Sequence, residues 1–232
     1  MKPKILKNVT IITFSLFVLL TTVLFISCNK ESEIVEKSVE TIFNEVVFTD
    51  SKGSVISIDD ASLDLPDAVL ILMEDKDSRS GIKAQYFKTE EDAYKYISEI
   101  PELTDAKEKM DFARRVRSLA EKTGDINVED PELFSKEMKT LLASYNPIAD
   151  RGMGLLYDLS PPAGDYFPIT GNAQVSLFSF NNRATSAQGF GLANWLWSRT
   201  WFRGSAVYLL LGTAHFIPLK DLNFDNQACS SL

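Results

Sequence analysis

Apolar and polar residues divide the chain of 232 residues into three stretches with different patterns. An apolar run from Val9 to Ile26 contains no charged residue. Between residues 41 and 147, short strand-like runs give way to apolar residues at helical spacing. After Pro147 charged residues become rare, while glycine, asparagine, serine and aromatic residues become frequent, which favours strands joined by many turns. The pattern therefore predicts an α+β region followed by an all-β region.

The amino end has the order of a secretory signal. Lys2, Lys4 and Lys7 precede the apolar run, and the small residue Ser27 follows it. An uncleaved transmembrane anchor is the alternative, because about 18 apolar residues can just span a bilayer. Both interpretations place the rest of the chain outside the cytoplasm.

The segment Leu24-Phe25-Ile26-Ser27-Cys28 resembles the lipobox of bacterial lipoproteins. The resemblance implies that residues 1–27 are a signal peptide and that Cys28 carries diacylglycerol on its sulfur and a third acyl chain on its amino group. Residues 28–40 are then a lipidated tether, and several acyl chains on one residue suffice for stable membrane anchoring. Lys30-Glu31 is similar to surface-export signals of Bacteroidetes-type lipoproteins. We therefore expect the outer membrane, on its periplasmic or cell-surface side.

Residues 41–147 are predicted to form a small α+β region, whose role the sequence leaves open. Thr89 precedes three acidic residues and then apolar residues at helical spacing, which predicts a helix N-terminus. Asp130-Pro131 predicts the start of another helix. Strands are expected at 42–48, 55–58, 68–72 and 83–87, and helices at 89–100, 105–122 and 130–145.

Charge and cysteine content exclude several classes of function. The net charge is -8, and residues 1–27 hold three lysines and no acid, so the mature chain carries -11. A nucleic-acid partner is not expected, because phosphate binding needs a basic surface. Cys229 is the only cysteine besides Cys28, so no intrachain disulfide framework can form. A single histidine also argues against an ordinary zinc site.

One pattern occurs twice after Pro147, which is stronger evidence than either copy alone. The clearer copy has Trp197, Phe202 and Gly204 in Trp197-Ser198-Arg199-Thr200-Trp201-Phe202-Arg203-Gly204, followed later by Asp225-Asn226-Gln227-Ala228-Cys229-Ser230. The earlier copy has Tyr157 and Gly164, followed by Asn181-Asn182-Arg183-Ala184-Thr185-Ser186, and has Pro162 where the second aromatic residue would stand.

Both copies resemble the Greek-key motif of the βγ-crystallin family, over residues 152–232. In that motif an aromatic pair packs on a folded hairpin, and a glycine supplies a backbone angle that a side chain would obstruct. The resemblance implies a βγ-crystallin-like domain of two Greek-key motifs, about 152–189 and 190–232, that exchange strands in one β-sandwich. The fold class expected for the whole chain is an α+β N-terminal region followed by an all-β Greek-key sandwich.

The resemblance also implies calcium sites built from both loops. The candidate ligands are Asn181, Asn182 and Thr185 in the first loop and Asp225, Asn226 and Ser230 in the second. The second loop has two possible registers: counted from Asp225, its hydroxyl position is Cys229, and counted from Asn226, it is Ser230. The alternative is that both loops are ordinary turns whose asparagines and serines bind their own backbone.

No catalytic motif stands out. His215 lies alone in a strand-like context, and no nucleophile elbow is present. We therefore expect a non-catalytic, lipid-anchored exported protein whose C-terminal domain binds calcium weakly as a structural ion. The alternative is a protein-binding module, such as a peptidase inhibitor, that uses the aromatic cluster of Trp195, Trp197, Trp201, Phe202 and Arg203. The other reading of this cluster is that it forms the domain core.

Overall fold

A computed structural model describes residues 46–75, 77, 81–145, 153–159, 164–170, 173–190, 193–210 and 213–232. The predicted signal peptide, Cys28 and the predicted tether lie outside these ranges. No helix within the described ranges is long and apolar enough to span a membrane.

The N-terminal part consists of four strands followed by helices. Thr89 caps the first helix, because its side chain accepts a hydrogen bond from the Asp92 N–H. The strands are β1 (Val47–Thr49), β2 (Val55–Ile56), β3 (Val69–Glu74) and β4 (Ile82–Phe87), and the helices are α2 (Glu90–Glu99), α3 (Thr104–Thr123) and α4 (Lys136–Ala143), with 3-10 turns η1 (Pro101–Leu103), η2 (Asp125–Asn127) and η3 (Pro131–Leu133).

The predicted third helix begins later than expected. Asp130 caps only the short turn η3, and the backbone becomes extended at Phe134. Ser135 then caps α4 by accepting a hydrogen bond from the Met138 N–H. Asp130-Pro131 therefore begins a 3-10 turn, and the α-helix itself starts at Lys136.

The C-terminal part forms a Greek-key sandwich with exchanged strands, which confirms the predicted fold class. The smaller sheet has the order β10-β7-β5-β6, so it takes β10 from the second copy of the motif. In the other direction, Gln174 of the first copy bridges Ser231 of the second. The strands are β5 (Met153–Tyr157), β6 (Tyr166–Thr170), β7 (Ser186–Phe190), β8 (Ala193–Arg199), β9 (Arg203–Leu210), β10 (Thr213–Pro218) and β11 (Ser230–Ser231), with 3-10 turns η4 (Phe178–Phe180) and η5 (Leu219–Leu222).

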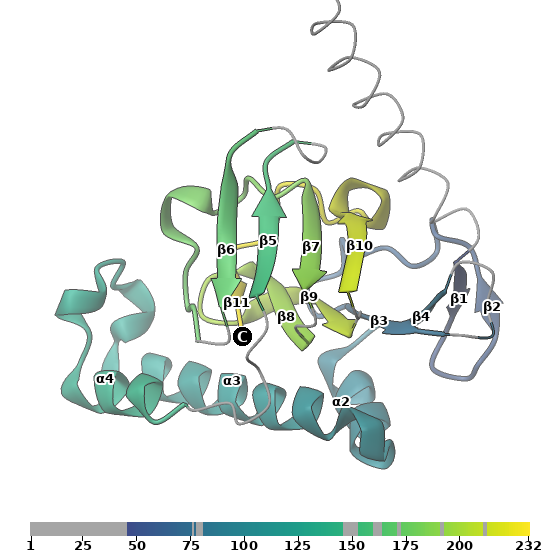
Figure 1. The fold of residues 1–232 in the computed structure, drawn as a ribbon. Coiled ribbons are helices and arrows are strands. Elements are labelled where there is room, and N and C mark those ends of the chain that lie inside the picture. Colours follow the sequence, from purple (N-terminus) through teal and green to yellow (C-terminus); the bar gives the residue numbers. More distant parts are fainter. Residues whose placement is uncertain are drawn as a thin grey trace, which may run out of the picture.

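The regions predicted as 41–147 and 152–232 share one sheet. Its order is β11-β8-β9-β3-β4-β1-β2, and β3 pairs in parallel with β9, from Val69 opposite Ala206 to Met73 opposite Leu210. Figure 1 shows the helices as a layer on the face of this sheet that is turned away from the smaller sheet. The chain therefore forms three layers: small sheet, large sheet and helices.

The first five residues of strand β3 are apolar, and both faces of the strand are buried there. Leu70 and Leu72 belong to the core between the two sheets, whereas Val69 and Ile71 belong to the core under the helices. Side chains alternate in the same way along a strand in general. Trp195 of β8 points to the helical side, where its indole N–H donates to the Ala106 carbonyl of α3 at 3.1 Å.

Candidate functional site

The two predicted calcium loops, residues 181–186 (the first loop) and 225–230 (the second loop), face each other through reciprocal backbone hydrogen bonds. The Asn182 N–H donates to the Ala228 carbonyl at 3.1 Å, and the Asn226 N–H donates to the Ala184 carbonyl at 2.9 Å. Both asparagines have left-handed backbones, with φ of 57° and 53°. Asn tolerates this conformation better than other side chains do. The loops are therefore related by an approximate twofold axis.

This symmetry decides the register of the second loop. Asn182 corresponds to Asn226, so Asp225 corresponds to Asn181 and Cys229 corresponds to Thr185. The backbone bonds of Cys229 and Thr185 agree with this register. The Cys229 carbonyl accepts from the Leu177 N–H at 2.7 Å, and the Thr185 carbonyl accepts from the Leu219 N–H at 2.9 Å. A thiol thus stands at the hydroxyl position of the second loop.

Ser230, the candidate of the other register, lies away from the paired loops. Its hydroxyl donates to the Arg199 carbonyl at 2.7 Å and accepts from the Phe202 N–H at 3.1 Å. The residue is fully buried, so it serves the corner of the β8–β9 hairpin. The structure does not bring Ser230 together with the other five candidate ligands.

The two symmetry-related halves of the site differ in chemistry. In one half, the Cys229 thiol donates to Asn182 Oδ1 at 3.0 Å. In the other half Thr185 lies opposite Asn226, and its hydroxyl donates to the Asp158 carbonyl at 3.2 Å. Calcium prefers hard oxygen ligands, so only the Thr185 half offers a suitable donor set.

The first asparagine of the first loop is used for local structure. Asn181 Oδ1 accepts from the Leu177 N–H at 2.9 Å, and its amide donates to Ser176 Oγ at 3.0 Å. In the second loop Asp225 accepts from the amide of Asn226 at 3.1 Å. Asn181 therefore stabilises the turn before the first loop. The carboxylate of Asp225 is exposed beside Asn226.

Sequence reasoning missed Asp158, which lies next to Thr185. Its backbone carbonyl accepts from the Thr185 hydroxyl, and its carboxylate pairs with Arg183 at 2.6 Å. Arg183 also pairs with Asp165 at 2.8 Å. Asp158 follows β5, and only the antiparallel pairing of β5 with β7 brings it to the loop, so no local signal in the sequence could identify it.

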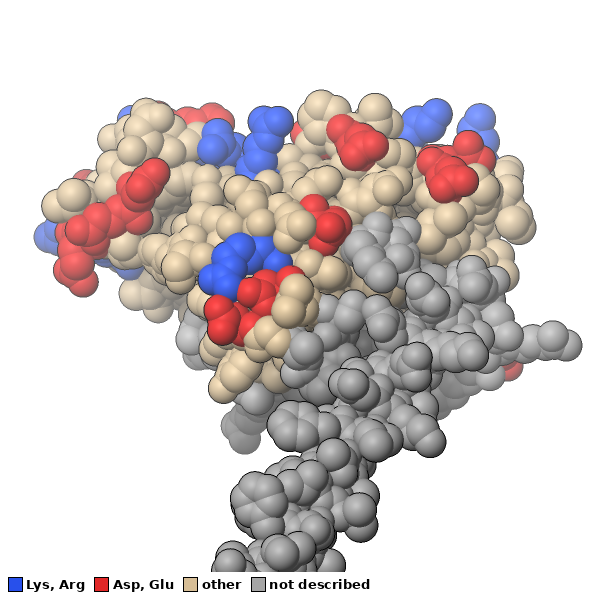
Figure 2. All heavy atoms as spheres, turned by 90° about the horizontal axis from the view of Figure 1, so that it is seen from above, with Lys and Arg blue, Asp and Glu red and all other residues tan. Residues whose placement is uncertain are grey.

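Acidic and basic side chains are interspersed on the surface. Figure 2 shows them next to one another on the face that it displays. Within the described part of the chain, no three His, Cys, Asp or Glu side chains converge as they would around a metal ion. An ion at the paired loops would therefore depend on amide, hydroxyl and carbonyl oxygens.

The aromatic corners of the two motifs are built from different ring pairs. The rings of Trp197 and Phe202 lie 5.0 Å apart, and those of Tyr157 and Tyr166 lie 6.5 Å apart. Gly204 has φ of 80°, and a Cβ there would lie 2.3 Å from Ser198 Oγ. Gly164 is the equivalent glycine of the first motif, after β5. Pro162 stands where this motif would have its second aromatic residue, and the ring of Tyr166 pairs with Tyr157 there.

The tryptophan cluster forms core rather than surface. Trp195, Trp197, Trp201 and Phe202 are all at most 3% exposed. They pack with the helices in the core on that side of the large sheet. These four side chains therefore cannot present a protein-binding surface. The side chain of His215 is not among those that the structure describes.

No protein-family model and no curated protein matches the chain. Among solved structures it is similar to a chain described as "Evolution of the eye lens beta-gamma-crystallin domain fold", with 20% sequence identity and a TM-score of 0.31. The match covers 38% of this chain and 89% of the other. The assignment of the fold rests on the strand exchange described above.

Proposed function

We propose that this chain is a non-catalytic, lipid-anchored exported protein whose Greek-key sandwich binds one weak structural calcium ion at the half-site of Thr185 and Asn226. The observation that carries the proposal is the reciprocal pairing of the two loops. It places Asn226, which follows Asp225, opposite Ala184, the residue before Thr185, and the Thr185 hydroxyl lies against the Asp158 carbonyl. The polar side chains among these and the neighbouring carbonyls are all hard oxygen donors.

The affinity expected for this half-site is low. Calcium needs six to eight oxygens, and its affinity follows the number of charged ligands. Asp225 supplies a free carboxylate, whereas the charge of Asp158 is partly neutralised by Arg183. A dissociation constant on the order of 10⁻⁴ to 10⁻³ M, as in other extracellular modules, follows from this charge.

Weak binding still stabilises a protein outside the cell, because a ligand that binds only the folded state adds RT ln(1 + [L]/Kd) to its stability. With 10 mM calcium and a Kd of about 1 mM, the gain is about 1.4 kcal/mol. For a chain of this size, that corresponds to a rise in Tm of about 3–5 °C.

Thermal melts of the full-length chain in non-ionic detergent test the proposal. The chain is melted in EDTA, in 10 mM calcium and in 10 mM magnesium. Thr185→Val removes the hydroxyl at constant volume and should abolish the calcium-specific rise. The matched control is Thr140→Val on the exposed face of α4, which should retain it. No calcium-specific shift in the wild type would show that the loops are structural turns.

Lipid anchoring is tested separately on expressed cells. Mass spectrometry of the mature amino terminus should find three acyl chains on Cys28, and Cys28→Ala should leave residues 1–27 uncleaved. An unmodified Cys28 with the leader still attached would favour the transmembrane-anchor alternative.

A further inference from the structure

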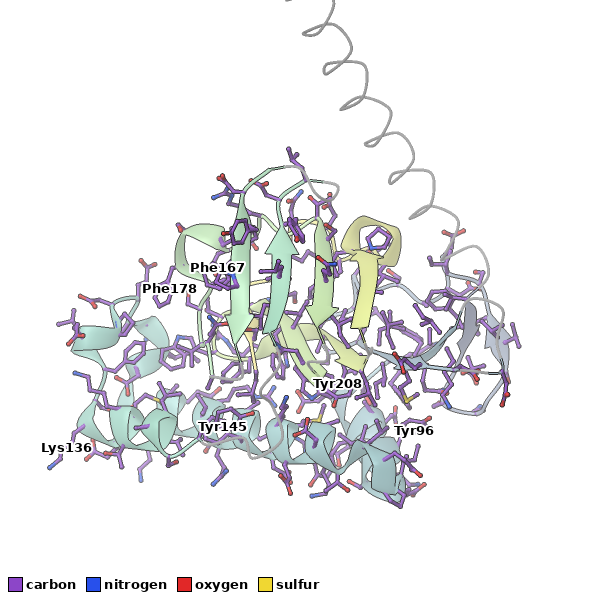
Figure 3. The ribbon with its side chains drawn as sticks, in the orientation of Figure 1. Tyr96, Lys136, Tyr145, Phe167, Phe178 and Tyr208 are labelled. Atoms are coloured by element: carbon purple, nitrogen blue, oxygen red, sulfur yellow. The ribbon has the colours of Figure 1, made fainter. Side chains whose placement is uncertain are left out.

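A second site lies where the helical layer meets the side of the sandwich. This cleft, about 610 Å³ in volume, is bounded by the segment 126–134 and by residues 175–181 and 200–201. Pockets of about 300–1,000 Å³ are the usual size for small-molecule sites. We call it the aromatic cleft, after the rings of Phe134, Phe178 and Trp201 that line it. Figure 3 shows Phe178 on the side of the sandwich above the end of the helical layer that carries α4.

The three rings occupy different depths of the cleft. The rings of Phe134 and Trp201 lie 5.0 Å apart, and both residues are nearly buried. Phe178 is 51% exposed. Phe134 and Trp201 form the floor of the cleft, so Phe178 is the ring of the three that offers an exposed face to a ligand.

Two of these rings are held on strained backbone. Phe178 and Trp201 have φ of 52° and 61°, a region that bulky residues rarely adopt. Hydrogen bonds fix both: the Phe178 N–H donates to Ser176 Oγ at 3.0 Å, and the Trp201 N–H donates to the Val175 carbonyl at 2.8 Å. Strain of about 1–3 kcal/mol per residue persists only where surrounding contacts hold the backbone, and residues strained in this way are common at ligand sites.

The charge of the cleft selects the sign of its ligand. Among the residues that the structure describes, Glu129 is the only charged one that lines it, and none of the described lysines and arginines does. Glu129 makes no ion pair within the described residues. The acidic chain as a whole attracts cations in addition. Anionic ligands are thereby disfavoured, while a cation gains from both the carboxylate and the exposed face of Phe178.

We propose that the aromatic cleft binds an organic cation, an ammonium or guanidinium group on an apolar stem. The group lies against the exposed ring of Phe178, and its charge is balanced by Glu129. The amide of Asn127 and the hydroxyl of Thr200 also line the cleft and provide hydrogen bonds to a polar substituent. This proposal is independent of the calcium site.

Matched probes test the role of the charge. Choline and its neutral isostere 3,3-dimethylbutan-1-ol are titrated into the full-length chain in non-ionic detergent, with calorimetry and tryptophan fluorescence as readouts. We expect choline to bind about tenfold more tightly, which corresponds to about 1.4 kcal/mol. N-acetyl-arginine amide and N-acetyl-lysine amide form the second arm. If the two amino-acid amides bind more tightly than choline, the natural ligand is a cationic side chain of a protein. If choline binds more tightly, the natural ligand is a free small amine.

Two variants separate binding from folding. Glu129→Gln should weaken choline binding about tenfold without changing Tm, whereas Glu132→Gln, an exposed acid of the same segment, should leave binding unchanged. Phe178→Gly removes the ring and also relieves the left-handed backbone, so it should weaken binding while Tm stays equal or rises. Equal binding of choline and its neutral isostere, or no binding of any of the cations, overturns the proposal.

Discussion

The thiol of Cys229 donates a hydrogen bond to Asn182 Oδ1 at 3.0 Å, across the interface between the two symmetry-related loops. Burial raises the pKa of this thiol, and a hydrogen bond from the Asn182 backbone offsets part of the rise. The thiol therefore stays protonated at neutral pH. It takes the place that the Thr185 hydroxyl holds in the other half, so this half is closed to a hard cation.

Replacing the thiol by a hydroxyl should open the closed half-site. Cys229→Ser supplies an oxygen donor at the position equivalent to Thr185, so we expect a larger calcium-dependent rise in Tm than in the wild type and a stoichiometry that increases from one ion to two. Calcium calorimetry together with melts measures both. Cys229→Ala is the matched control, because it removes the thiol without adding a donor. Identical calcium responses of the Ser and Ala variants would contradict the assignment.

A side chain at Gly204 should destabilise the corner of the β8–β9 hairpin. Gly204→Ala combines a left-handed backbone with a Cβ placed 2.3 Å from Ser198 Oγ. The backbone strain costs about 1–2 kcal/mol, and relief of the overlap adds to it, so we expect a loss of about 3 kcal/mol in the free energy of unfolding.

Gly53→Ala provides the comparison for Gly204, measured by urea denaturation. Gly53 has φ of 78° but no atom within 4 Å of the added Cβ. This variant should lose only the strain of about 1–2 kcal/mol. If the two variants lose equal stability, the contact with Ser198 does not constrain the corner.

Local patterns in the sequence predicted the motif and the elements apart from the start of α4, but not the contacts between distant segments. Helix α3, expected at 105–122, spans Thr104–Thr123, and the strand exchange follows the repeated motif. The pairing of β3 with β9 was not predicted, because an apolar run shows that a strand is buried and not which strand lies beside it.

The site shows the same division between local and distant information. Asn182 and Asn226 were correctly placed in facing loops, yet only their reciprocal hydrogen bonds decide the register that puts Cys229 opposite Asn182. The aromatic cleft depends on the backbone angles of Phe178 and Trp201. The Trp201 backbone is held by a hydrogen bond to the carbonyl of the distant Val175, so no local pattern of residue types predicts its angle.

Acid should weaken the contact between α2 and α3 through Glu90. Burial alone would raise the pKa of Glu90, but hydrogen bonds and charge from Arg117 and Arg114 outweigh it, and the pKa lies below its ordinary value. A lowered pKa means that the contribution to stability is present above the pKa of the unfolded chain, about 4.3, and is lost as pH falls through the folded value.

Glu90→Gln tests this linkage. At pH 7 we expect a loss of about 2 kcal/mol, the usual value for hydrogen bonds to a charged group. Between pH 5 and 3 the free energy of unfolding should fall less steeply in the variant than in the wild type. Glu91→Gln is the control, because its side chain is 79% exposed and pairs with Arg114 at the surface. Parallel pH profiles of wild type and Glu90→Gln would exclude Glu90 as the titrating group.

The shared sheet predicts that the helical and Greek-key parts unfold together. All three tryptophans, Trp195, Trp197 and Trp201, lie in the Greek-key part, whereas α2, α3 and α4 lie in the N-terminal part. Tryptophan fluorescence and circular dichroism at 222 nm therefore report on different parts of one molecule. Because β3 lies between β9 and β4, and Trp195 bonds to α3, we expect both signals to change with one midpoint in urea.

A single substitution at the junction makes the test of this coupling sharper. Ile71→Ala in β3 lies opposite Tyr208 of β9 and removes buried volume from the core under the helices. It should lower both midpoints equally, by about 2–5 kcal/mol in the free energy of unfolding. The comparison variant Val55→Ala sits in the edge strand β2, where the side chain is 74% exposed, and should leave both midpoints unchanged. Two separate transitions, with only the 222 nm signal displaced by Ile71→Ala, would mean that the parallel pairing does not couple the parts.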